Sequence, residues 1–376
     1  MKRFFFLLCA LALLWVVGMF LPAEPPLPAP EAAPAPEREP GPVTVTLVAA
    51  GDNLIHDVLY EQAKTGSGYD FCPLYRHIRP LIEEADLALI NQETPMAGSF
   101  PPSGYPRFNS PVELAQGLAQ SGFDVLSLAN NHMLDMGPEG LGETIGLVRE
   151  TPGLSVTGAF LPGEEAAPLL LEKNGITFAI LGFTSYTNLG GGADSGGGMV
   201  PLLRDDERLR ALMARARERA DVVVVYTHWG QEDSFAVTTS QRDSARLLAR
   251  EGADIILGSH PHVVQSAEAL AAPDGRQAWV LYSLGNLVSA QRKGQNLVGL
   301  LPRFTIRKGA DGRVEIDPPA LTPVVTYYGP HFRDLAVYPL KQYTPDLAAG
   351  HGVRAFGEEL SPEAVRAILR ENGITQ

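Results

Sequence analysis

Six apolar runs of this chain each end in polar side chains that can bind a metal. In chain order, the segments at these ends are GDNLIH, NQE, NNH, HWG, HPH and LGN. Because open α/β sheets bind ligands at the carboxyl ends of their strands, six such ends in series predict a single cluster. Carboxylate, imidazole and carboxamide groups suit one or two divalent ions, with Mn, Zn and Fe all compatible. The candidate residues are Asp52, His56, Asn91, Glu93, Asn131, His132, His228, His260, His262 and Asn286.

A histidine pair and a carboxylate belong to this joint signal, although a histidine pair alone is weak evidence, because histidines at strand ends are often only hydrogen-bonded structural groups. His260 and His262 are two residues apart, so on an extended backbone their imidazoles point the same way and serve two neighbouring metals or one metal twice. Glu93 is the only carboxylate close to the end of its strand, and it could bridge two cations about 3.5–4 Å apart. Asp52 and His56 share one loop and are suited to Zn, Fe or Mn, although an aspartate there could also cap a turn.

For each of the other polar residues near these strand ends, two interpretations are open. Asn131 is of a type common in turns, and His228 follows the most apolar strand, where a hydrogen-bonded core histidine is the simpler alternative. Asp135 lies three residues after His132 and either orients that imidazole or belongs to a turn. Arg107 either meets a substrate anion or is an ordinary surface arginine.

Alternating strands and helices must position these groups. Asn174-Gly175 between two apolar runs predicts a hairpin, so the fold class is α/β with a sheet that is not all parallel. Helices are expected at 71–85, near 111–120, at 137–150, 204–220 and 239–251, and from Pro362 after the capping Ser361. Strands are expected at 44–50, 87–90, 125–129, 169–172, 177–183, 222–227, 255–258, 279–282, 300–307, 314–316 and 321–327.

Composition restricts the functional class. The chain has 376 residues and a formal net charge of −13, and it shows no basic patch, so nucleic acid is not an expected partner. Cys9 lies in an N-terminal apolar run, which leaves Cys72 alone in the rest of the chain and excludes an intramolecular disulfide there. His77, His331 and His351 lie away from the six strand ends and are interpreted as surface residues.

The N-terminus predicts a membrane anchor. Residues 1–21 combine a positive start with an uncharged apolar run of 18 residues at 4–21, and a helix of 18 residues spans roughly 27 Å, close to a bilayer core. A cleaved secretory signal is the alternative, but the run is longer than a typical signal core and no clean cleavage site follows it, which favours an uncleaved anchor. Residues 22–42 are rich in proline and are expected to form an extended linker. By the positive-inside rule, the protein would be a single-pass protein of the cell membrane with its domain on the extracytoplasmic side.

The six segments in this order resemble the CapA family of capsule or poly-γ-glutamate synthesis proteins, which is related to the calcineurin-like metallophosphoesterases. The residues that carry the resemblance are GD…H, N-x-E, NNH-x-x-D-x-G, HWG-x-E, G-x-HPH-V-x-Q and YSLGN, within about residues 44–290. The resemblance implies a metallophosphatase-like layered sandwich of mixed β-sheets flanked by helices. That domain would span residues 43–330 and be followed by a C-terminal extension, 331–376, with a final helix.

The resemblance also implies a role for each matching position. Three residues separate Asp52 from His56 where the phosphoesterase pattern has one, and Glu93 stands where that pattern has aspartate. The implied roles are those of first-metal ligand for Asp52, His56 and His262, of bridging ligand for Glu93, of second-metal ligand for Asn131, His228 and His260, and of proton donor to the leaving group for His132. Beside these, their places in the sequence predict that Asp135 orients His132 and that Asn91, Asn286 and Arg107 are supporting or substrate contacts.

The sequence is therefore compatible with two alternative functions. The first is a cell-surface metal-dependent hydrolase or transferase that acts on an anionic polymer or a phosphoester, with His132 as general acid. The second is a non-catalytic polymer-binding subunit of a membrane complex for synthesis or export, which would have further membrane subunits as partners. A serine hydrolase or a P-loop enzyme is not expected, because the chain has neither G-x-S-x-G nor G-x-x-x-x-G-K-[ST].

Overall fold

The computed structural model describes residues 42–188 and 199–374. The chain from residue 42 onward forms one compact unit. The predicted anchor (1–21) and nearly all of the predicted linker (22–42) lie outside the described residues. Within the described ranges, no helix is both long and apolar enough to cross a bilayer.

The first of two sheets has nine strands and is mixed. The strands β1 to β4 run parallel to one another, and the later strands pair in antiparallel fashion at the other side of β1. Its order is β15 (Ala336–Pro339), β14 (Ala320–Tyr327), β12 (Val298–Lys308), β1 (Val43–Asn53), β2 (Leu87–Gln92), β3 (Val125–Ser127) and β4 (Ser155–Thr157), with β11 (Asn286–Val288) beside β1 and β13 (Val314–Ile316) beside β12.

The second sheet has six strands and is also mixed. Its four inner strands are parallel, and each edge strand is antiparallel to its neighbour. Its order is β5 (Leu169–Lys173), β6 (Ile176–Thr184), β7 (Val222–His228), β8 (Ile255–Ser259), β10 (Gln277–Leu281) and β9 (Ala267–Ala271).

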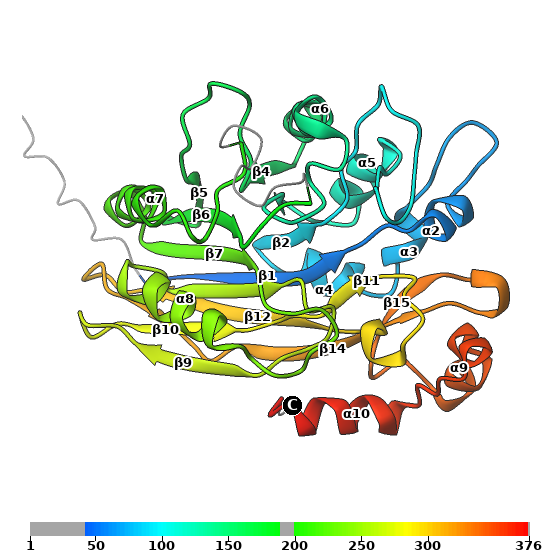
Figure 1. Ribbon diagram of the computed structural model, residues 1–376. Helices are drawn as coiled ribbons and strands as arrows, with labels where there is room; N and C mark the ends of the chain where they lie inside the picture. Colours follow the sequence, from blue (N-terminus) through cyan, green and yellow to red (C-terminus); the bar gives the residue numbers. More distant parts are fainter. Residues whose placement is uncertain (1–41, 189–198, 375–376) are drawn as a thin grey trace, which may run out of the picture. The chain divides into compact units, whose positions relative to one another are not determined.

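Helices cover the outer faces of the sheets (Figure 1). Apolar residues of α7 and α8 pack on the second sheet, and those of α4, α5 and α6 join the core of the first. In Figure 1, α5 and α6 lie toward the β2–β4 side and α10 lies beyond β14. The helices are α2 (Asp57–Gln62), α3 (Cys72–Tyr75), α4 (Arg79–Glu83), α5 (Glu113–Gln120), α6 (Gly137–Glu150), α7 (Asp206–Arg219), α8 (Thr239–Arg250), α9 (Pro345–Gly350) and α10 (Pro362–Glu371), with short 3₁₀ turns at Gly294–Leu297, Pro330–Phe332 and Gly352–Phe356.

The two sheets pack face to face, and the β-branched strand β7 shows why. Val224 and Tyr226 point into the core between the sheets, whereas Val223 and Val225 point toward α7 and α8. A strand that is buried on both faces needs a continuous apolar run, as this one has. The Tyr226 hydroxyl also donates to the carbonyl oxygen of Ala50 in the facing sheet, at 3.0 Å. The expected α/β class with mixed sheets flanked by helices is therefore confirmed.

The predicted elements were mostly found, with one clear error. The helix at 137–150, the strand at 314–316 and the hairpin around Asn174-Gly175 are confirmed. The single helix expected at 71–85 is wrong, because the structure has two short helices, α3 and α4, in that stretch. Pro73 and Pro80 each lie near the start of one of them, where their missing N–H costs no helical hydrogen bond.

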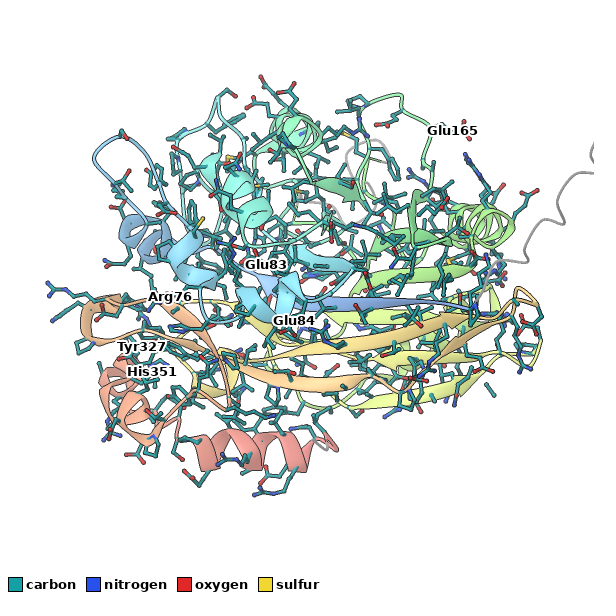
Figure 2. The ribbon with its side chains drawn as sticks, turned by 180° about the vertical axis from the view of Figure 1, so that it is seen from behind. Arg76, Glu83, Glu84, Glu165, Tyr327 and His351 are labelled. Carbon is teal, nitrogen blue, oxygen red and sulfur yellow. The ribbon has the colours of Figure 1, made fainter. Side chains whose placement is uncertain are left out.

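The interpretation of His351 as a surface residue is also wrong. Its side chain is 2% exposed, and Figure 2 shows it beside Tyr327, whose ring centroid is 5.2 Å from that of His351. The backbone N–H of Val353 donates to its Nδ1 at 3.1 Å, so Nε2 carries the proton that is donated to the Thr326 carbonyl oxygen, also at 3.1 Å. Burial lowers the pKa of His351 to about 4.

This depressed pKa predicts that His351 stabilises the fold above pH 6.5 and loses that effect on acidification. The unfolded chain binds a proton at His351 below about pH 6.5, whereas the folded chain does so only near pH 4. The stability difference between the wild type and His351→Asn should therefore shrink by about 2 kcal/mol between pH 8 and pH 5. Urea unfolding of both proteins at the two pH values measures it, and a difference that stays constant with pH would contradict the assignment.

Candidate metal centre

The registers of the parallel strands bring the candidate residues together. In the first sheet, Asp52 on β1 is opposite Asn91 on β2 and Asn286 on β11. In the second sheet, His228 at the end of β7 is opposite Ser259 at the end of β8. The backbone N–H of His260 donates to Asp52 Oδ2 at 3.1 Å, which joins the ends of the two sheets.

Glycine makes the close approach beside Asp52 possible. The N–H of Asp52 donates to the carbonyl oxygen of Gly285 at 3.0 Å. A Cβ atom on the preceding Gly51 would lie only 1.9 Å from that same oxygen. Any side chain at position 51 would therefore push β1 away from the segment that carries Asn286.

The first group of candidate ligands is buried and consists of Asp52, Glu93 and His262. One ligand atom from each lies within 4.8 Å of the others. Asp52 Oδ1 accepts a hydrogen bond from Asn91 Nδ2 at 2.8 Å, and Asp52 Oδ2 lies 3.3 Å from His262 Nδ1. Asn91 thus fixes the carboxylate and leaves its second oxygen facing His262 and the His260 N–H.

Glu93 is the residue whose surroundings most require a cation. It is 0% exposed, and within the described part of the chain neither carboxylate oxygen has a hydrogen-bond partner. Its Oε1 lies 3.7 Å from both His228 Nε2 and His262 Nε2. Burial, followed by the Asp52 charge, raises the pKa of Glu93 well above its ordinary value. Since a buried carboxylate without hydrogen bonds is costly, a divalent cation fits this position.

His262 is oriented for ligation by its neighbour Asn286. The Asn286 carboxamide donates to the Asn296 carbonyl oxygen and to Gln291 Oε1, both at 2.8 Å, so its Oδ1 accepts from His262 Nδ1 at 2.9 Å. This contact leaves Nε2, the atom near Glu93, free to bind a cation. Burial alone would lower the pKa of His262, but Glu93 and Asp52 raise it to about 10, so without a metal this ring holds a proton between the carboxylates, and a bound cation would have to displace that proton from Nε2.

The second group contains His228, His260 and Asn131. The Ser259 hydroxyl donates to the Thr227 carbonyl oxygen and accepts from His228 Nδ1, which leaves the His228 Nε2 lone pair facing Asn131 Oδ1 at 2.7 Å. Two acceptors this close repel unless a proton or a cation lies between them. A proton is disfavoured, because burial and the neighbouring His260 lower the pKa of His228 well below its ordinary value. These atoms therefore also fit a metal ligand set.

His260 completes this second group. Its Nδ1 lies 3.2 Å from His228 Nε2, and the Tyr186 hydroxyl lies 3.3 Å from its Nε2. Burial, with a contribution from His262, lowers the pKa of His260 to about 3, so the imidazole is neutral, as a ligand must be. The extended backbone expected for the histidine pair is wrong, since φ is +94° at His260 and +57° at His262. Such left-handed strain at two non-glycine residues is typical of functional sites.

His132 and Asp135 form the pair that was predicted as a general acid and its orienting carboxylate. His132 Nδ1 lies 2.7 Å from Asp135 Oδ2, and the same oxygen accepts from the Phe108 N–H at 2.8 Å. The Phe108 ring packs edge-on against the imidazole, with centroids 4.8 Å apart. Asn188 Nδ2 also lies 3.2 Å from His132 Nδ1, so the ring is fixed in position by Asp135, Asn188 and Phe108.

A cavity of about 560 Å³ opens in front of this pair. Arg107 lies at its wall, but its Nε and one terminal nitrogen donate to the Asp135 backbone carbonyl oxygen, at 3.1 and 2.6 Å. Arg107 therefore supports the His132–Asp135 segment as well as lining the cavity. The lining residues are Tyr105, Pro106, Arg107, Asn131, His132, Leu134, Asp135, Tyr186, Asn188 and Glu232.

His56 is placed apart from both groups. Its Nδ1 lies 3.1 Å from the Leu54 carbonyl oxygen and 3.3 Å from the Ala290 backbone nitrogen. Its ring packs edge-on against Phe108, with centroids 5.4 Å apart, and burial lowers its pKa to about 4. In the described part of the chain it joins no group of three close ligand atoms. Its role as a metal ligand stays a prediction.

Glu232 is a candidate that the sequence reasoning did not assign. One of its carboxylate oxygens lies within 4.8 Å of ligand nitrogens of His260 and His262. The signal was present in the segment HWG-x-E, where Glu232 follows His228 by four residues. An exposed glutamate in a loop is, however, seldom assigned from sequence alone.

Comparisons with known proteins agree with the residue pattern. The family described as Bacterial capsule synthesis protein PGA_cap matches residues 46–291 of this chain. The PGA biosynthesis protein CapA of Bacillus subtilis (strain 168) is 30% identical over 254 residues, which is 65% of this chain and 64% of that protein. The capsule biosynthesis protein CapA of Bacillus anthracis is 29% identical over 256 residues, 65% of this chain and 60% of that protein. The chain thus spans less than two thirds of the length of both relatives.

Solved structures give weaker likenesses. A putative 5′-nucleotidase from Staphylococcus aureus in complex with α-ketoglutarate has 16% identity and a TM-score of 0.47, covering 75% of this chain and 55% of that one. A hypothetical protein from Thermus thermophilus has 16% identity and a TM-score of 0.45, covering 73% and 98%.

Proposed function

Since this chain belongs to the bacterial capsule synthesis protein PGA_cap family, we propose that it acts in the synthesis or export of capsule or poly-γ-glutamate through a metal-dependent, hydrolase-type site. The observation that supports a metal most directly is Glu93, a fully buried carboxylate with no hydrogen bond to either oxygen among the described residues. Its Oε1 lies 3.7 Å from one imidazole nitrogen of each ligand group, His228 Nε2 and His262 Nε2. A cation there would replace the missing partners.

The residues that would hold the metal fall into the two groups described above. Asp52, Glu93 and His262 offer an oxygen-rich set, and Asn131, His228 and His260 offer a set with two imidazoles. When bound, a divalent cation would activate water and offset the negative charge that develops on a phosphoryl or acyl centre. The protein supplies ligand atoms that are already turned toward one another, which reduces reorganisation during the reaction.

We assign the proton transfer to His132. Its Nδ1 is engaged by Asp135 Oδ2 at 2.7 Å, which orients the ring. The other ring nitrogen is then free to give a proton to the leaving group. His132 lines the cavity and lies next in sequence to Asn131, a member of the second ligand group, so proton donor and candidate metal site adjoin.

The substrate class we propose is an anionic polymer or a phosphoester. Bound cations would reverse the local field of a chain whose formal net charge is −13. We further propose that residues 1–21 anchor the protein in the cell membrane as a single pass, with the domain on the extracytoplasmic side, and that membrane subunits for polymer synthesis or export are its partners. The names of the two curated relatives refer to biosynthesis, which favours a polymer-binding role without turnover as the second candidate.

The metal proposal predicts that the purified full chain contains one or two equivalents of a divalent metal and that His260→Ala loses at least one of them. His260 contacts His228 directly and shares a ligand group with His262, so its removal disrupts both sets. Elemental analysis after desalting measures the content, and His331→Ala, which changes an exposed histidine elsewhere, is the matched control. A metal-free wild type, or a His260→Ala protein with full metal content, would contradict the proposal.

A panel of phosphoesters and γ-glutamyl peptides then separates the two functions. Turnover that is lost in His260→Ala and retained in His331→Ala supports the enzyme. Metal-dependent binding of polymer by the wild type without any turnover of the panel supports the non-catalytic role instead.

A further inference from the structure

Glu232 lies at the wall of the cavity, directly over the histidine pair. Its carboxylate is grouped with His260 and His262, with all three ligand atoms within 4.8 Å of one another. His262 is also a member of the buried group with Asp52 and Glu93, so the two groups share one residue. Glu232 is exposed and lines the cavity, whereas the other four residues are buried.

The loop that carries Glu232 is held against the histidine pair by its neighbour Asp233. The Asp233 N–H donates to the carbonyl oxygen of Pro261, which lies between the two histidines, at 2.9 Å. The Asp233 carboxylate accepts from Asn296 Nδ2 at 2.7 Å and from Lys293 Nζ at 2.6 Å. Its backbone takes a left-handed conformation, with φ of +61°. These contacts fix position 232 relative to His260 and His262.

The Glu232 side chain makes no contact of its own that stabilises the fold among the described residues. Among the described residues its carboxylate makes no hydrogen bond and no ion pair, although the adjacent Asp233 is fully engaged. Glu232 thus combines a fixed backbone with a free carboxylate that faces two imidazoles. Such an arrangement suits a ligand better than a solvated surface residue.

The resemblance implies His56 as a further ligand of this site, and that role stays a prediction. Its Nδ1 contacts the Leu54 carbonyl oxygen at 3.1 Å, and its ring is packed against Phe108. Among the described residues it joins no group of three close ligand atoms, whereas the Glu232 carboxylate lies within 4.8 Å of ligand nitrogens of His260 and His262.

We propose that Glu232 is a further ligand of the cation site of Asp52, Glu93 and His262, which it joins through the shared residue His262. This inference rests on the proposed function, because it requires that the centre binds a metal. The completed set has three carboxylates and one imidazole, and oxygen-rich sets of this kind select hard cations such as Mn²⁺ or Mg²⁺ over Zn²⁺. The neighbouring set, with His228, His260 and Asn131, is richer in nitrogen. The chain would then hold a hard cation beside a borderline one.

The test compares Mn²⁺ binding by the full-length wild type, Glu232→Gln and the control Glu165→Gln, which makes the same change at an exposed glutamate outside both ligand groups. Calorimetric titration of the chelator-treated proteins, together with elemental analysis after loading and desalting, gives affinity and stoichiometry without any activity assay. We expect Glu232→Gln to weaken one Mn²⁺ site by at least about tenfold, as loss of a ligand contact should. We expect Glu165→Gln to bind within about twofold of the wild type.

A third variant tests the hardness of the site. Glu232→His replaces an oxygen ligand by a nitrogen ligand and should shift the preference of that site from Mn²⁺ toward Zn²⁺ by about tenfold or more. Because Glu232 is exposed and unpaired among the described residues, the metal-free variants should melt within about a degree of the wild type. Equal melting temperatures separate a ligand effect from misfolding.

The outcomes distinguish this inference from the function on which it rests. A wild type that binds neither Mn²⁺ nor Zn²⁺ would overturn both. A wild type that binds metal, with Glu232→Gln indistinguishable from it, would overturn only the assignment of Glu232. An equal loss of Mn²⁺ affinity in Glu165→Gln would likewise overturn the assignment of Glu232, because Glu165 belongs to neither ligand group.

Discussion

Replacing Glu93 by glutamine is expected to abolish metal loading and, at the same time, to make the metal-free protein more stable. The folded environment raises the pKa of this carboxyl group, through burial first and the Asp52 charge second. A carboxyl group with a raised pKa destabilises the folded state increasingly as the pH rises above its unfolded value of about 4.3. Glutamine has nearly the same shape and carries no charge, so the variant loses both that cost and the ligand.

The size of the expected gain in stability follows from the free-energy cost of burying a charged group without hydrogen bonds. The metal-free variant should gain on the order of 1–3 kcal/mol at pH 7.5 relative to the metal-free wild type. Adding Mn²⁺ should raise the melting temperature of the wild type and leave that of Glu93→Gln unchanged. Thermal unfolding with chelator and with metal measures both differences.

Glu165 provides the matched control for this substitution. It is exposed, pairs only with the exposed Arg215 among the described residues, and is labelled in Figure 2. An exposed ion pair contributes little, so Glu165→Gln should change neither stability nor metal response appreciably. A Glu93→Gln protein that is less stable than the wild type without metal, and still responds to Mn²⁺, would show that Glu93 is an ordinary buried carboxyl group.

Replacing His132 by glutamine is expected to lower turnover of an alkyl phosphoester by about 10²–10⁴-fold while the metal content stays the same. His132 faces the cavity and contacts Asp135, and it is not needed by either ligand group. Its assigned task is to protonate the leaving group. Steady-state kinetics and elemental analysis on the same preparation test both halves of this expectation.

The choice of leaving group separates a proton donor from a merely structural histidine. A nitrophenolate leaves without much help from an acid, so His132→Gln should lose far less activity on a nitrophenyl ester than on an alkyl ester. Asp135→Asn should show the same pattern with a smaller loss, because the amide oxygen can still accept from the imidazole and from the Phe108 N–H. Equal losses on both kinds of ester would count against general acid catalysis by His132.

Much of the scaffold of the site was predictable because it depends on local pattern. Apolar runs that end in polar residues identified most of the core strands, and the i, i+3 spacing of His132 and Asp135 suggested their contact. Strand β9 was missed, because its sequence Ala-Glu-Ala-Leu-Ala has no β-branched residue and forms a strand only by pairing with β10. Tertiary pairing decided its conformation.

The missed parts of the site depend on the path of the backbone through loops. Whether His56 reaches the cluster is determined by how the chain leaves β1, and the position of Glu232 is determined by the contacts of Asp233 with a distant loop. The left-handed conformations at His260 and His262 likewise follow from the contact between His260 N–H and Asp52, in the other sheet. None of these features leaves a periodic signal in the sequence.

The candidate ligands are drawn from both sheets, and this has a mechanical consequence. Asp52 and Glu93 follow strands of one sheet, whereas His228, His260 and His262 follow strands of the other. The Tyr226–Ala50 hydrogen bond joins the same two sheets. A cation bound by these candidate ligands would cross-link the two sheets at a place where the ligands are buried. Release of the cation would then allow the two sheets to move relative to each other, and would not merely free a single loop.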